Sequence, residues 1–278
     1  MSLMDRMRTE TESKYEGETK KDSRGRSVNV RVDPFGEIKR NIHEEIIEEM
    51  DPNLLDNKDN PELVKSTVSS LLSEKISQID KPLSRGDREL ILKDLLDEVL
   101  GYGPIQALLD DREVTEIMVN GPFKVYVERK GKLTLSDRVF NNDSHVMRII
   151  EKIVAPIGRR IDESTPMVDA RLPDGSRVNA IIPPLALTGP TLTIRKFAVD
   201  PFGVDDLIKF ETLSKEMADF LKACVSSRLN IIVAGGTGSG KTTTLNVLSS
   251  FIPDGERVVT VEDAAELQLK QPHIVTLE

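Results

Sequence analysis

The sequence predicts a protein of mixed α/β and α+β class, and three observations support that prediction. A glycine-rich run ending in Gly-Lys-Thr follows an apolar segment near residue 230 and precedes a helical pattern. From about residue 114, short β-branched segments alternate with turn residues. Before residue 100, apolar residues recur at helical spacing instead. These patterns are typical, in chain order, of a helical region, an α+β domain and a phosphate-binding α/β domain with a parallel sheet.

The first hundred residues fall into two parts. Residues 1–31 are polar and charged with few large apolar side chains, so we expect a flexible tail. Residues 32–108 are expected to be helical, with many Glu side chains on an outer face that is either solvated or docks a partner. The apolar stripes that predict the three helices run through Ile38, Ile42, Ile46 and Met50, through Leu63, Val64, Val68, Leu71, Leu72 and Ile76, and through Leu90, Ile91, Leu95 and Val99.

Residues 109–200 are expected to form an α+β domain. Val114–Val119 and Lys124–Arg129 are strand-like, and a helix with an apolar stripe follows them. A second hairpin flanks Pro173–Ser176, a turn in which proline and glycine supply the required dihedral angles. Asp200–Gly203 is expected to link this domain to the last one, residues 201–278. The stripe of the helix consists of Val146, Ile149, Ile150 and Ile153.

The glycine-rich run has the G-x-x-x-x-G-K-[ST] spacing of a phosphate-binding P-loop. Its glycines let successive backbone N–H groups turn toward an anion, and the following helix, expected over Lys241–Phe251, directs its positive end at the phosphates. Lys241 is expected to reach the β- and γ-phosphates and the Thr242 hydroxyl to bind Mg²⁺. The predicted nucleotide-binding residues are Gly235, Gly236, Thr237, Gly238, Ser239, Gly240, Lys241, Thr242 and Thr243.

Strands are expected on both sides of that helix. Asn230–Ala234 reads as the strand before the P-loop and Val258–Val261 as a second one, in the βαβ order of a parallel sheet. Glu262, Asp263 and Glu266 then follow the second strand, where the ligands of open parallel sheets gather. One such carboxylate can hold the attacking water while another supports hydrated Mg²⁺.

Composition limits the function classes. A net charge of −9 argues against a protein that coats nucleic acid, because neutralising phosphates requires clustered Lys and Arg. Cys224 is the single cysteine, so no internal disulfide is expected. No apolar stretch approaches the roughly 18 residues that span a bilayer, and we expect a cytoplasmic protein. His145 and His273 lack metal-ligand spacing and are expected to have ordinary surface or core roles.

From about Leu90 to Glu278 the chain resembles the secretion and pilus ATPase superfamily, and within it the tight-adherence (Tad) pilus, CpaF-like branch. Five matches in the same order make the resemblance specific, whereas the P-loop alone is shared by dozens of families. The matching segments are Val114–Pro122, Arg171–Asn179, Thr193–Phe197, the P-loop and Thr260–Glu266, the last of which resembles the acidic box of these motors.

The resemblance implies an ATP-hydrolysing motor with a RecA-like P-loop domain, which binds Mg²⁺ and ATP and powers pilus assembly or protein secretion. It implies that Glu266 is the catalytic base and that Glu262 and Asp263 are supporting contacts to water and metal. Arg177 and Arg195 match arginines that reach the nucleotide across a subunit boundary. The implied partners are further copies of the chain, in a hexamer, and platform proteins of the inner membrane, to which the motor is peripheral.

The sequence stops at Glu278, fifteen residues past Asp263. The Walker B strand and histidine box that the resemblance implies would follow that point. We therefore expect a fragment with a truncated RecA-like domain that hydrolyses ATP poorly.

Two alternatives come from other classes. A RecA-type DNA-translocating ATPase shares the P-loop, but it would need a basic groove or stacking aromatics, and this chain has no Trp and 4% aromatic residues. DNA-stimulated turnover would favour it. The other alternative is a nucleotide-gated assembly scaffold without turnover, in which the acidic helical region is the working part. Loss of pilus or secretion function on deleting residues 32–100, with ATPase activity unchanged, would favour the scaffold.

Overall fold

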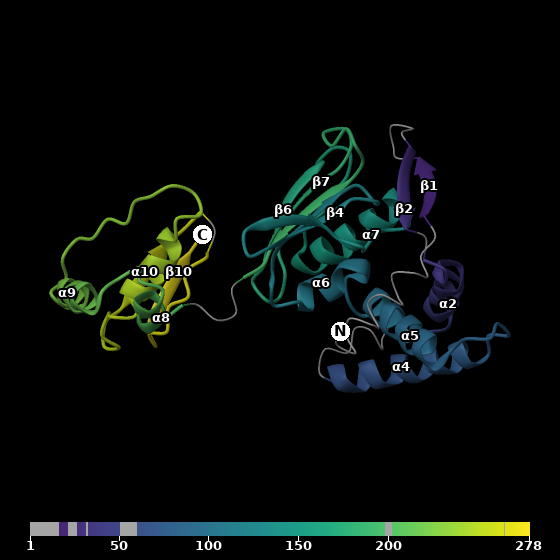
Figure 1. Cartoon of the computed structure of the whole chain (residues 1–278), viewed down its shortest axis with the longest axis horizontal. Coiled ribbons are helices and arrows are strands. Elements are labelled where there is room, and N and C mark those ends of the chain that lie inside the picture. The colour runs from purple at the N-terminus through teal and green to yellow at the C-terminus, as the bar shows by residue number, and fades with distance from the viewer. Residues whose placement is uncertain (1–16, 22–26, 32, 51–59, 198–201, 264) are drawn as a thin grey trace. The chain divides into compact units, whose positions relative to one another are not determined.

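The computed structural model describes residues 17–21, 27–31, 33–50, 60–197, 202–263 and 265–278. The chain divides into a first unit, Met1–Lys196, and a second unit, Phe197–Glu278, and each is described by itself (Figure 1). The expected linker at residues 200–203 lies partly outside the described residues. Within the described ranges, no helix is both long and apolar enough to cross a membrane.

A hairpin stands where the sequence predicted a flexible tail. β1 (Gly17–Lys21) pairs antiparallel with β2 (Ser27–Arg31). In the sequence of β2, Val28 and Val30 alternate with polar residues, which suits a strand, and the ladder satisfies the backbone N–H and C=O groups with which each strand faces the other. The other residues of the predicted tail lie outside the described residues.

Three helices form the first core: α2 (Gly36–Glu49), α4 (Pro61–Ser77) and α5 (Arg85–Val99). Two of them begin at side-chain caps, since Asn60 accepts a hydrogen bond from the Leu63 N–H and Ser84 forms a capping box with Asp87. Most residues of the predicted apolar stripes meet inside, where Ile46, Val68, Leu72, Ile91 and Leu95 are at most 1% exposed. Leu63, predicted as part of the second stripe, is instead 50% exposed.

A six-stranded antiparallel sheet forms the second core of the first unit, in the order β5-β4-β3-β8-β7-β6. α7 (Asp143–Val154) contacts the sheet through β6 and β8, and its predicted stripe is buried (Figure 1). The short helices η1 (Gly103–Ile105) and α6 (Gln106–Asp110) lead into the sheet, and η2 (Ala155–Ile157) follows α7. The strands are β3 (Val114–Asn120), β4 (Val125–Arg129), β5 (Lys132–Leu135), β6 (Met167–Arg171), β7 (Arg177–Ile181) and β8 (Thr191–Arg195).

Polar contacts join the helical core to the sheet domain. Glu98 of α5 lies 2.8 Å from Nε2 of His145 on α7, and Lys152 donates hydrogen bonds to the last carbonyls of α5, including Val99 at 2.8 Å. Burial acts to raise the pKa of Glu98, but His145, His43 and Arg148 outweigh it and hold that pKa below its usual value. His145 therefore has a structural role in a buried junction, and the described residues contain no cluster of three or more His, Cys, Asp or Glu side chains that could hold a metal ion.

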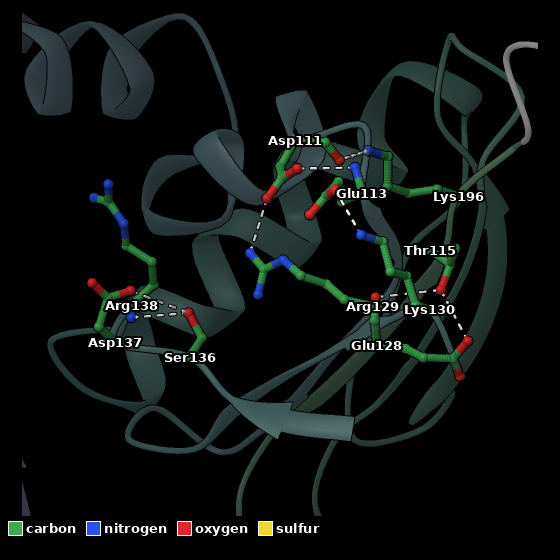
Figure 2. A network of polar contacts seen from close by, with 10 residues as sticks. All are labelled: Asp111, Glu113, Thr115, Glu128, Arg129, Lys130, Ser136, Asp137, Arg138 and Lys196. Atoms are coloured by element: carbon green, nitrogen blue, oxygen red, sulfur yellow. Dashed lines mark hydrogen bonds and ion pairs between the residues drawn. The ribbon is translucent and has the colours of Figure 1, made fainter. Parts of the chain in front are cut away.

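A second network fastens the start of β3 (Figure 2). Arg129 of β4 donates to the Asp111 carboxylate at 2.9 Å, and the Lys196 ammonium donates to the Asp111 carbonyl at 2.7 Å. The bond from Arg129 is the main reason that the pKa of Asp111 lies below its usual value. Thr115 bonds the Glu128 carboxylate at 2.9 Å on the neighbouring strand. These contacts fix the register of β3 between β4 and β8.

The second unit contains α8 (Val204–Lys209), α9 (Lys215–Ser226), α10 (Lys241–Ser249) and a parallel pair of strands, β9 (Val258–Val261) and β10 (Ile274–Leu277). The prediction of a strand over Asn230–Ala234 is wrong, since that run is not in a strand and Ile232 is 92% exposed. A parallel strand is held by neighbours distant in sequence, and no described strand pairs with this run.

Candidate nucleotide-binding site

The glycine-rich loop leads directly into the N-terminus of α10. Gly240, the residue before the helix, has a φ of 86°, and Gly238 has a φ of 73°, so both lie in the left-handed region that favours glycine. At neither residue would an added Cβ have an atom within 4 Å. A Cβ at Gly235 would instead lie 2.5 Å from Oγ of Ser239. The loop is therefore open toward solvent, closely folded at its start, and continuous with a helix end that favours anions.

The predicted phosphate-binding side chains surround this loop. The Lys241 ammonium donates to the Gly236 carbonyl at 2.7 Å, so it is folded back over the loop. Thr237, Ser239 and Thr242 are exposed, and Thr243 is half-buried in the first turn of α10. All of these side chains therefore come from one short segment, either from the exposed loop or from the first turn of the helix that follows it.

The acidic box forms a turn directly after β9. Glu262 accepts hydrogen bonds from the backbone N–H groups of Glu266 at 2.8 Å and Leu267 at 3.0 Å, both through Oε2. Its Oε1 is buried and has no hydrogen-bond partner among the described residues. Asp263 is exposed and Glu266 is half-buried. The sequence predicted Glu262 as a contact to water and metal, whereas here its carboxylate folds the turn that presents Asp263 and Glu266.

Two polar residues that the sequence reasoning missed connect the segment after β9 to the region of the P-loop helix: Asn246 contacts the end of the acidic turn, and Gln271 contacts the C-terminal end of α10. Asn246 of α10 accepts a hydrogen bond from the Gln268 N–H at 2.9 Å. The buried Gln271 side chain donates to the Ser249 carbonyl at 2.7 Å and to the Ile252 carbonyl at 3.2 Å. Neither belongs to a recognised motif. The sequence offered one signal for the role of Asn246. This polar residue stands directly before Val247 and Leu248, which are buried in a helix that was expected to pack on a sheet.

The predicted arginines lie on the sheet of the first unit. Arg177 of β7 is directly opposite Arg171 of β6 on one side and Arg195 of β8 on the other. Residues that face each other across strands point to the same side, here the side away from the core, since neighbouring Val178 and Ile194 are fully buried. Three guanidinium groups thus form one arginine row, although like charges placed opposite each other repel.

Within that row, the half-exposed Arg177 forms a long ion pair with Asp169, in which Nη2 lies 3.7 Å from Oδ1. An ion pair of this length and exposure contributes little stability. The row belongs to the first unit, and the P-loop and acidic turn to the second. The predicted residues are therefore divided between the two units: the arginines lie in the first unit, and the phosphate-binding residues and the carboxylates lie in the second.

Residues 98–278 match the family described as "Type II/IV secretion system protein", and the chain belongs to that family. An uncharacterized protein of Methanocaldococcus jannaschii is 43% identical over 181 residues, which cover 63% of this chain and 25% of the relative. The type IV secretion system protein VirB11 of Bartonella quintana is 30% identical over 209 residues, or 63% of this chain and 58% of the relative. The chain thus spans less than two thirds of the length of either protein.

Among solved structures, the VirB11 ATPase of the Brucella suis type IV secretion system in complex with sulphate is 29% identical. The alignment covers 63% of this chain and 59% of that one, with a TM-score of 0.37. A score this low does not establish a common spatial arrangement of the parts.

Proposed function

We propose that this chain is the nucleotide-binding part of an ATP-hydrolysing motor that powers pilus assembly or protein secretion across the bacterial envelope. The observation that carries the proposal is the loop before α10, which combines left-handed Gly238 and Gly240 with Lys241 in the first helical turn. A loop of this kind binds the phosphates of a nucleotide through backbone N–H groups and a lysine.

The residues fit Mg²⁺ and ATP. The open positions around Gly238 and Gly240 leave room for a phosphate chain against the backbone. The Lys241 ammonium donates a hydrogen bond to a carbonyl of its own loop. A phosphate oxygen is a stronger acceptor for the same ammonium and would replace that carbonyl. We assign nucleotide binding to residues 235–243 and metal binding to Thr242 and Asp263, whose oxygen atoms are of the type that Mg²⁺ prefers.

Bound Mg²⁺-ATP supplies a terminal phosphoryl group that water can attack. In the proposed reaction Glu266 accepts the proton of that water, and Glu262 supports it by holding the turn. Arg177 and Arg195 stabilise negative charge on the transferred group, a role for which a guanidinium suits phosphate oxygens. Hydrolysis and product release then change the relation between domains and so perform work.

The finer assignments rest on the order of the five family-like segments in the sequence. We assign the chain to the Tad, CpaF-like branch and to a homohexamer in which Arg177 and Arg195 reach a neighbour's nucleotide. The motor is cytoplasmic, peripheral to the inner membrane, and acts on platform proteins there. No nucleic-acid partner is proposed.

We also propose that the 278-residue chain hydrolyses ATP slowly. The run before the P-loop is exposed at Ile231 and Ile232, and Leu229, Ile231, Leu248 and Val259 line an adjoining groove of about 480 Å³. A P-loop without strands packed beside it is poorly held, and small displacements of positioned groups reduce rates strongly. Equal turnover by this chain and by a version of the relatives' length would contradict this point.

Release of phosphate from ATP tests the proposed function. Wild-type chain should show slow Mg²⁺-dependent turnover, and Lys241→Ala should reduce it at least about 10²-fold, as expected for losing one positioned cationic donor. Lys222→Ala, which removes an exposed lysine of α9 in the same unit, is the matched control. Wild-type turnover in Lys241→Ala, with the control also unchanged, would refute the role of the P-loop.

A further inference from the structure

A backbone hydrogen bond attaches the acidic turn to the P-loop helix. The N–H of Gln268 donates to Oδ1 of Asn246, five residues after Lys241 on the same helix. At its start, the turn is folded by Glu262, which accepts from Glu266 and Leu267. The described residues of the turn, 262, 263 and 265–268, are therefore held by a carboxylate at one end and by an α10 amide at the other.

A cavity of about 70 Å³ lies beside this attachment. Its lining consists of Phe202, Gly203, Asn246, Val247, Ser250, Gln268, Leu269 and Lys270. Because a cavity separates the two segments at this place, the hydrogen bond from Gln268 to Asn246 contributes to the spacing between them. The nearby bonds from buried Gln271 to Ser249 and Ile252 support the C-terminal end of α10 rather than the turn itself.

We propose that Asn246 is a positioning residue that sets the distance between the P-loop and the acidic turn, and so aligns Asp263 and Glu266 with phosphates held by Lys241. This inference rests on the proposed function and deepens it. Asn246 does not touch nucleotide in this role, because it acts through Gln268 and the backbone that leads to Glu266.

Amide hydrogen exchange of the whole chain without nucleotide tests the attachment itself. In Asn246→Ala, exchange in the peptide covering 262–270 should rise about 3- to 10-fold, the range that the net contribution of one hydrogen bond allows. Asn246→Asp keeps the acceptor oxygen and should remain near wild type. Ser250→Ala is the matched control, because the Ser250 hydroxyl bonds only the Val247 carbonyl within its own helix turn among the contacts described. Wild-type exchange in Asn246→Ala would overturn the proposal.

Single-turnover ATP hydrolysis and ATP affinity test the consequence. Asn246→Ala should lower the hydrolysis rate about 10- to 100-fold, as a misplacement of about 1 Å does, while the Kd for ATP and the Tm stay near wild type. Asn246→Asp should recover most of the rate. A parallel loss of affinity and Tm would indicate a merely structural role, and an unchanged rate would reject the positioning role. No turnover by the wild type would reject the proposed function instead, leaving the exchange experiment to decide the attachment.

Discussion

The two units of this protein bury their apolar residues to different degrees. In the six-stranded antiparallel sheet, Ile117, Val127 and Val178 are fully buried, whereas in the second unit Ile232 is 92% and Val261 81% exposed. Hairpins bring strands together from neighbouring sequence, while parallel strands require neighbours from distant sequence. The first unit thus completes its own core, and the second holds its functional segments by side-chain hydrogen bonds to the backbone.

The largest expected effect is on ATP turnover, and it concerns Arg177, a residue of the antiparallel sheet that we propose takes part in the reaction at the P-loop. Arg177→Ala should reduce ATP turnover by about 10³-fold, the lower range for arginines that stabilise a transferring phosphoryl group. Stability should change by less than about 0.5 kcal/mol, because the ion pair with Asp169 is long and exposed.

Arg85→Ala is the control for that variant, since this arginine is 94% exposed on α5 and pairs with Glu89 one helical turn away. Phosphate release and thermal unfolding are measured for both variants. Equal turnover by Arg177→Ala and Arg85→Ala would show that the arginine row has no part in the reaction.

The difference in burial predicts a difference in stability. Ile150 of α7 is completely buried, so Ile150→Ala should destabilise the first unit by about 3 kcal/mol through lost burial and a residual cavity. The matched substitution Ile157→Ala, at a side chain that is 45% exposed, should cost much less. Urea unfolding followed by tyrosine fluorescence isolates this unit, because all three tyrosines precede residue 197 and the chain has no Trp.

In the second unit the same kind of substitution should have almost no effect. Ile232→Ala should change the unfolding free energy by less than about 0.5 kcal/mol, as is usual for exposed positions, when unfolding is followed by circular dichroism. A cost near that of Ile150→Ala would mean that the run 230–234 is packed in solution, and the contrast between the two units would fail.

A smaller, pH-dependent effect is expected within the helical core. Burial is the main cause that raises the pKa of Asp97 from 3.8 to about 6, with Asp94 and Asp110 adding to it. The folded state then binds the Asp97 proton more tightly than the unfolded state, so protonation of Asp97 stabilises the fold. This contribution to stability is complete below about pH 3.8 and is lost as pH rises through about 6.

Asp97→Asn should therefore stabilise the protein at pH 7 by about 1 kcal/mol, after allowance for solvent screening of a partly exposed group. At pH 4 the gain should nearly disappear. Urea unfolding at the two pH values measures the gain in unfolding free energy. An equal gain at both would show that ionisation of Asp97 does not destabilise the folded protein.

Local sequence predicted most of the first unit. The helical period of Val146, Ile149, Ile150 and Ile153 placed α7 and its buried face, because that pattern needs no distant partner. The turn at Gly175 was equally readable, since its φ of 88° favours glycine. Arg177 and Arg195 were predicted as site residues, but the row that they form with Arg171 depends on the register of β7 with β6 and β8, which no local pattern fixes.

In the second unit, the motif predicted the loop and the carboxylates but not what holds them. The apolar run Asn230–Ala234 suggested a buried strand, although burial depends on partners that the run itself does not specify. The attachment through Asn246 arises from a chain reversal between α10 and β10, so its two partners lie 22 residues apart. Such contacts follow from tertiary structure rather than spacing.

Hydrogen exchange of the whole chain with and without Mg²⁺-ATP tests the central claim most directly, that nucleotide phosphates bind at the loop before α10. Mg²⁺-ATP should protect the peptide covering residues 235–244 and leave the strands β3 and β8 unchanged, and Lys241→Ala should abolish the protection. Exchange in residues 235–244 that is the same with and without Mg²⁺-ATP in the wild-type chain would contradict the claim.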